Sequence, residues 1–293
     1  MPLRLLVLGA MLALAPGALA QTRKPPLPPG RDPGGVAIAL LSTGIDYTQP
    51  DIAGRLARDG EGELIGLDMQ DGDDRPFAAA GAETRDRWGG DGTALAKAVG
   101  GPGRRIVPVR IDPGSAVSIA RAVAFLAQTP ARIVVVPMWS AEKADWEPFR
   151  QAASHFRDLL FIVAAGDEGK DIDEQPAWPA AFGLSNVLVV TAPLSRATES
   201  TLAPNGGDKA VDALVSATRQ LRNAMGQTVL PPDTTRMAAV LAADALAGCW
   251  PQLVASFKGE ALKTAFLAEA AKAWPNATKP IIERCVDGAA PQR

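Results

Sequence analysis

Residues 36–51 read VAIALLSTGIDYTQPD. The first six residues form a continuous apolar run, which is typical of a strand buried on both faces of a sheet. A polar turn that contains Ser42 and Gly44 follows the run directly. The stretch therefore predicts the first strand of an α/β domain.

The same pattern continues along the chain, where apolar runs alternate with helical segments. We expect strands at residues 64–67, 105–111, 132–137, 159–165 and 187–192, and helices at residues 92–99, 115–129, 146–157, 235–248 and 258–273. Strands that alternate with helices indicate a mostly parallel sheet with helices on both faces. We place this α/β domain at residues 36–274, followed by a C-terminal tail at residues 275–293.

The N-terminus has the features of a secretory signal peptide. Residues 1–20 combine a basic start, a short apolar core and an A-x-A end, so we expect cleavage after Ala20 and an exported protein, periplasmic or secreted. An uncleaved anchor is the alternative, although the apolar run is too short to span a bilayer stably. Residues 21–35 contain five prolines and three glycines and are predicted to form a linker.

Composition excludes several classes of partner and cofactor. The formal net charge of −2 provides no basic excess for nucleic acid or for an anionic membrane, so we expect neither as a partner after signal cleavage. Cys249 and Cys285 are predicted to form a disulfide in an exported protein, with two free buried thiols as the alternative. Two cysteines and a single histidine cannot complete a zinc shell, so we expect no metal and no cofactor.

Four stretches resemble, in the same order, the motifs of the subtilases, the subtilisin-like serine proteases. They are VAIALLSTGIDYTQPD at 36–51, GGDGTALAKAVGG at 89–101, FIVAAGDEG at 161–169 and TTRMAAVLAADAL at 234–246. The resemblance covers almost all of residues 36–273. It implies a three-layer α/β/α subtilisin-like fold and a serine-type endopeptidase.

The positions that would carry the family's chemistry hold other residue types. The resemblance places Ser42 at the position of the catalytic aspartate, Asp91 at that of the histidine, Arg236 at that of the nucleophile and Asp167 at that of the oxyanion asparagine. A guanidinium stays protonated and cannot act as a nucleophile. An ionised carboxylate cannot donate a hydrogen bond to an oxyanion. His155 is the only histidine and lies outside every motif. We therefore predict a pseudopeptidase without catalytic residues.

Opposite charges replace two residues that the family fold brings together. The resemblance implies that Asp91 and Arg236 face each other, so we predict an ion pair between them, with Asp167 as a possible second acid for the guanidinium. The family's substrate-binding segment corresponds to Met138, Trp139 and Ser140, and we expect a remnant cleft there that binds a peptide or a protein.

Two other functions compete with this interpretation. A divergent peptidase could use Thr235, beside Thr234, as nucleophile and Asp91 as base in an acidic site. A nucleotide-binding protein could use the glycine-rich residues 100–103, but these follow a helix and precede a strand, the reverse of a phosphate-binding loop.

Overall fold

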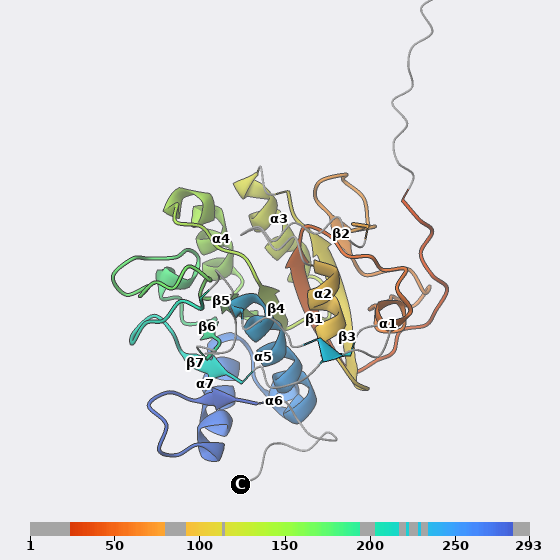
Figure 1. Cartoon of the computed structure of the whole chain (residues 1–293). Coiled ribbons are helices and arrows are strands. Elements are labelled where there is room, and N and C mark those ends of the chain that lie inside the picture. Colours follow the sequence, from red (N-terminus) through yellow and green to blue (C-terminus); the bar gives the residue numbers. More distant parts are fainter. Residues whose placement is uncertain are drawn as a thin grey trace, which may run out of the picture.

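The computed structural model in Figure 1 describes residues 24–79, 92–112, 115–193, 203–216, 221–222, 228–229 and 234–283. The signal peptide predicted at residues 1–20 lies outside this part of the chain. Among the described residues, no helix is both long enough and apolar enough to cross a bilayer.

The described strands build one large sheet and one small hairpin-like pair. The large sheet contains β1 (Val36–Ser42), β2 (Leu67–Asp68), β3 (Arg104–Arg110), β4 (Ile133–Val136), β5 (Leu160–Ala164), β6 (Val187–Thr191), β7 (Ala213–Val215) and β10 (Ile281–Ile282). Their order is β10-β7-β6-β5-β4-β1-β3-β2, and the described pairings are all parallel. The small pair, β8 (Leu221–Arg222) and β9 (Thr228–Val229), is antiparallel.

Helices cover the sheet and complete the three layers. They are α1 (Pro50–Ala53), α2 (Gly92–Ala98), α3 (Ala116–Leu126), α4 (Lys143–His155), α5 (Thr235–Cys249), α6 (Pro251–Ser256) and α7 (Gly259–Ala273), with a 3-10 turn η1 at Ala180–Phe182. Helices α2 and α5 pack against each other and against β1, and α5 also contacts β4, β5, β6 and β7. Helices α3 and α4 form a separate packed pair (Figure 1). The predicted α/β/α architecture is confirmed.

The long predicted elements form because their apolar pattern fits their position. Six of the seven residues of β1 and all residues of β4, β5 and β6 are buried, as expected for central strands of a parallel sheet. All residues of α5 except Gly248 are buried, because this helix is apolar all round.

The short elements differ from the predictions. The strand expected at residues 64–67 is reduced to Leu67–Asp68, and Leu64 instead bridges Arg58. The segment expected to be a C-terminal tail contributes β10, which pairs with Leu214 and Val215. A strand of two residues is too short to show a period in the sequence, so its place depends on the neighbouring strand.

Residues 24–35 contain no helix or strand, but they are bound to the domain. The Tyr47 hydroxyl donates to the carbonyl oxygen of Pro25 at 2.8 Å. Asp32 accepts a hydrogen bond of 2.7 Å from the Arg105 guanidinium. The segment that we expected to be a linker is therefore anchored to the sheet and its loops.

Lys24 anchors the start of this segment. Its Nζ atom lies 2.6 Å from Asp68, 2.9 Å from Asp71 and 2.8 Å from Asp73. Asp68 is fully buried and also binds Arg110 at 3.0 Å. Burial alone would lower the pKa of the Lys24 ammonium, but hydrogen bonds to the three carboxylates raise it above its ordinary value. Lys24 and Arg110 therefore share the compensation of the negative charges of this acidic loop.

The predicted disulfide is only partly within the described chain. Cys249 is the last residue of α5 and is 9% exposed. Cys285 lies outside the described residues, so the pairing stays a prediction.

A buried ion pair fixes the C-terminal half of α5. Arg104 Nε lies 3.0 Å from Asp244 Oδ1, and the two side chains are 10% and 1% exposed. The same oxygen accepts a hydrogen bond of 2.8 Å from the Gly100 amide. A Cβ atom at Gly248 would lie 1.6 Å from Nη2 of Arg104, so this turn of the helix needs glycine to leave room for the guanidinium.

We expect Asp244→Ala to lower the free energy of unfolding by about 3–5 kcal/mol, because it leaves the Arg104 charge buried without its carboxylate. Urea denaturation followed by circular dichroism measures the change. Asp158→Ala is the control, since Asp158 pairs with Lys258 on the surface and should leave the midpoint unchanged. Equal effects of the two substitutions would contradict the structural role of Asp244.

Candidate functional site

The end of β1 touches the start of α2. Ser42 is 1% exposed, and its hydroxyl accepts a hydrogen bond of 3.1 Å from the Gly44 amide. A Cβ atom at Gly92 would lie 2.7 Å from the Ser42 hydroxyl and 2.3 Å from the Gly44 carbonyl oxygen, so only glycine allows this approach. Asp91, which precedes Gly92, lies outside the described residues.

The turn after β5 is joined to the start of α5. Asp167 Oδ1 accepts a hydrogen bond of 2.7 Å from the Thr235 amide. The Thr235 hydroxyl accepts one of 3.0 Å from the Gly166 amide. Thr234 is the N-cap residue, and its side chain accepts from the Met237 amide at 3.4 Å. Asp167 therefore acts as a second cap for the amides that begin α5, where a negative charge is favourable.

Burial changes the acidity of Asp167. The side chain is almost covered, with 3% exposure of the residue. Burial raises its pKa to about 6, although the hydrogen bonds from Thr235 and the positive charge of Arg236 act in the opposite direction. The carboxyl group is therefore ionised at neutral pH and protonated in mild acid.

Arg236 is stacked on an aromatic ring that the neighbouring loop holds in place. Its guanidinium carbon lies 4.7 Å from the centre of the Trp139 ring. Trp139 Nε1 donates a hydrogen bond to the Glu168 carboxylate. The other Glu168 oxygen accepts one of 2.8 Å from Asn205 Nδ2. The hydrogen bond to Glu168 thus fixes the orientation of the Trp139 ring. Arg236, which is 7% exposed, stacks on the face of this ring.

The sequence did not identify Glu168 or Asn205 as part of this site. Glu168 follows Asp167 inside a motif, which is a signal that could have indicated it. Asn205 belongs to no motif. Its side-chain oxygen accepts from the amides of Glu168 and Lys170 at 3.0 and 2.9 Å, so its role depends on tertiary contact.

The predicted substrate-binding segment is packed into the domain. Met138, Trp139 and Ser140 are 0%, 4% and 1% exposed. The backbone of Ser140 pairs with that of Trp178 through two hydrogen bonds of 2.9 Å, and the Ser140 hydroxyl accepts from Trp146 Nε1 at 3.1 Å. Peptide binding along this segment stays a prediction, and in this structure its side chains are covered.

The remaining candidate residues lie elsewhere or are used for packing. His155 is exposed at the end of α4, next to the Phe156 ring. The glycine-rich turn at residues 100–103 connects α2 to β3, and its Gly103 carbonyl oxygen accepts a 2.9 Å hydrogen bond from the Val36 amide. Within the described residues, no group of histidine, cysteine, aspartate or glutamate side chains could hold a metal ion.

Comparison with known proteins identifies the fold of this chain but no sequence family. No family model and no curated protein matches this sequence. A lanthipeptide protease superposes with a TM-score of 0.60 at 16% identity, over 85% of this chain and 83% of that one. A cold-adapted subtilisin-like serine proteinase gives 0.58 at 19% identity, over 88% and 91%. The self-cleaved protease domain of PatA gives 0.55 at 16% identity, over 87% and 96%. The chain has the fold of the subtilisin-like proteases.

The raised pKa of Asp167 predicts a pH-dependent stability that Asp167→Asn should remove. A carboxyl whose pKa rises from 3.8 to about 6 on folding stabilises the protein fully below the unfolded pKa. This contribution is lost as the pH rises through the folded pKa, and it amounts to roughly 3 kcal/mol. Asparagine keeps an oxygen that can accept from the Thr235 amide, but it does not titrate.

Urea denaturation of both proteins from about pH 4 to about pH 7 tests this linkage. The stability of the unsubstituted protein relative to Asp167→Asn should fall as the pH rises. Parallel pH profiles would show that Asp167 has an ordinary pKa.

Proposed function

We propose that this chain is an exported subtilisin-like pseudopeptidase, which does not catalyse hydrolysis and acts by binding a peptide or a protein. The observation that carries the proposal is the burial and stacking of the Arg236 side chain. The resemblance assigns this residue to the nucleophile position, and its guanidinium is buried and stacked on Trp139. Export is supported by the signal-like residues 1–20.

Hydrolysis by a serine-type mechanism needs a nucleophile, a base and a donor for the oxyanion. The nucleophile position offers a guanidinium, which has no lone pair to attack with at any accessible pH. The oxyanion position offers Asp167, which is ionised at neutral pH because its pKa is about 6. Its negative charge would repel the charge that develops on a carbonyl oxygen.

One observation favours testing a second function, an acid-dependent peptidase. Below its pKa of about 6, Asp167 carries a proton and can donate a hydrogen bond. The nucleophile would then be Thr235. Against this, Thr235 is 0% exposed, and its hydroxyl oxygen accepts a hydrogen bond from the Gly166 amide. A substrate carbonyl could reach this oxygen only after α5 had moved.

An activity test separates the two functions. We expect the purified mature protein neither to react with a fluorophosphonate probe nor to cleave unfolded casein from about pH 3 to about pH 9. An active subtilisin-like protease serves as the positive control, and Thr235→Ala and Arg236→Ala are measured alongside. Cleavage in mild acid that disappears in Thr235→Ala would replace our proposal with the acid-dependent peptidase.

The proposed Asp91–Arg236 ion pair is tested by a double-mutant cycle. Asp91→Ala and Arg236→Ala should each lower the free energy of unfolding by about 3–5 kcal/mol, because each leaves the other charge without its partner. The double variant should lose clearly less than the sum of the two. Effects that add to within about 0.5 kcal/mol would show that the two side chains do not interact.

A further inference from the structure

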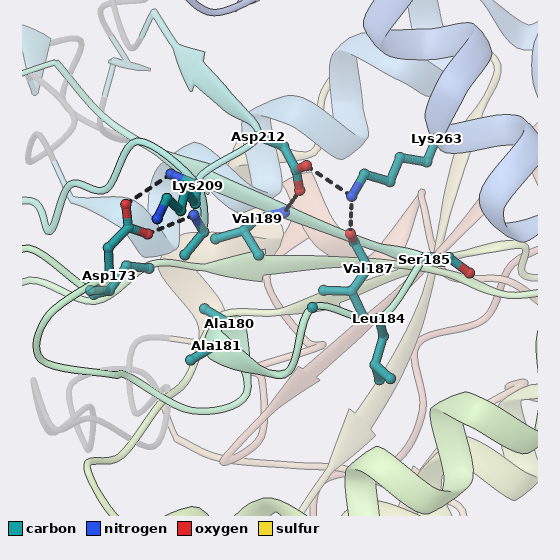
Figure 2. Close-up of a pocket in the computed structure, with 13 residues that line it drawn as sticks. Asp173, Ala180, Ala181, Leu184, Ser185, Val187, Val189, Lys209, Asp212 and Lys263 are labelled. Carbon is teal, nitrogen blue, oxygen red and sulfur yellow. Dashed lines mark hydrogen bonds and ion pairs between the residues drawn. The ribbon is translucent and has the colours of Figure 1, made fainter.

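A cavity of about 470 Å³ lies between the loop that follows β5, the strand β6 and the segment before β7 (Figure 2). This volume is within the range of about 300–1,000 Å³ that small-molecule sites usually have. The pseudopeptidase centre is filled by its own side chains, since Thr235, Trp139 and Arg236 are at most 7% exposed. The cavity therefore offers room for a ligand that the described part of the centre does not.

One wall of the cavity is apolar. The 3-10 turn η1 contributes Ala180 and Ala181, and Leu184 continues the wall toward Val187 and Val189 of β6 (Figure 2). The two alanines leave the space open because they have no side chain beyond Cβ. This wall suits one aliphatic side chain of a ligand.

The two carboxylates of the cavity are already hydrogen-bonded. Asp173 accepts from the amides of Lys209 and Ala210, both at 2.8 Å. Asp212 accepts from the Val189 amide at 2.8 Å and pairs with Lys263 at 2.9 Å. Both acids therefore stabilise the walls of the cavity.

The two lysines differ in what they can offer. Lys263 is used by the fold, because its ammonium also donates to the Val187 carbonyl oxygen at 2.6 Å. Lys209 lines the cavity with an exposed side chain. Within the described residues its ammonium forms no close ion pair. Hydrogen bonds from the amides of Lys209 and Ala210 lower the pKa of the neighbouring Asp173 carboxyl, and the positive charge of Lys209 lowers it further. The cavity thus combines an apolar wall with a cation that can bind an anion from the ligand.

We propose that this cavity binds the C-terminal carboxylate of a peptide that ends in an aliphatic residue. The aliphatic side chain lies against Ala180, Ala181 and Leu184, and the carboxylate pairs with Lys209. The Lys209 charge lies near Asp173, and a ligand carboxylate would give its ammonium a direct ion-pair partner. The terminal side chain would lie against the apolar wall. This inference rests on the proposed peptide-binding function and gives that function a place and a ligand class.

Isothermal titration calorimetry on the full mature protein tests the proposal with N-acetyl-alanyl-leucine as the free acid and as its C-terminal amide. We expect the acid to bind and the amide to bind about threefold more weakly, since an ion pair with a solvent-exposed lysine is weak and is screened by salt. Lys209→Gln should weaken binding of the acid by a similar factor. Ala181→Phe should abolish it by filling the cavity.

Lys170→Gln is the matched control, because it removes the same charge from a residue of the loop after β5 that does not itself line the cavity. It should bind the acid as the unsubstituted protein does. Thermal unfolding shows whether the Ala181→Phe variant is folded. If that variant does not fold, the surface substitution Lys209→Gln still tests the proposal. No binding of the acid, equal binding of acid and amide, or binding that survives both cavity substitutions would overturn the proposal.

A second measurement separates this inference from the proposed function. A longer peptide with the same C-terminal residue is incubated with the protein, and mass spectrometry shows whether the peptide has been cleaved. Cleaved peptide would refute the pseudopeptidase and leave the carboxylate site to be judged by calorimetry. Intact peptide without binding of the acid would refute the carboxylate site alone.

Discussion

The burial of α5 is the constraint on which the rest of the structure depends. This helix lies under β1 and β4 to β7, and almost all of its residues are buried. A buried helix must satisfy the amides that begin it and any charge that it carries. Asp167 accepts a hydrogen bond from the Thr235 amide at the N-terminus of α5. Arg104 forms an ion pair with Asp244 in the C-terminal half of the helix. The polar groups around α5 therefore hold an apolar element in one position.

The centre follows from the same constraint, because Arg236 is the second residue of α5. A guanidinium there cannot reach bulk water, so it needs a surface that tolerates a weakly hydrated cation. The Trp139 ring provides this surface, and Glu168 and Asn205 fix the ring. Arg236, Trp139, Glu168 and Asn205 therefore pack together beside the start of α5. We interpret the described part of the centre as a packed core of side chains.

The sequence predicted the parts of the fold that depend on local pattern. The apolar runs at residues 132–137 and 159–165 and the helix at 235–248 appear within one or two residues of their predicted ends. The motifs also indicated that Ser42, Asp167 and Arg236 belong to the candidate site. The structure shows which residues they contact. The docking of residues 24–35 and the support of Trp139 could not be predicted, because both depend on partners distant in sequence. A proline-rich segment has the same composition whether it is a free linker or bound by Lys24 to an acidic loop.

The cavity and the centre share a pair of loops. Residues 166–173 and 203–210 run side by side through bridges between Glu168 and Ala203 and between Asp171 and Gly206. Asn205 binds the backbone of this pair on one side and the Glu168 carboxylate on the other. Asp173 and Lys209, at the far end of the same pair, line the cavity. A ligand can shift the loops only by binding one arrangement more tightly than another. Since Glu168 holds Trp139, such a shift would move the surface on which Arg236 rests. The same pair of loops thus links a wall of the cavity to the support of Trp139.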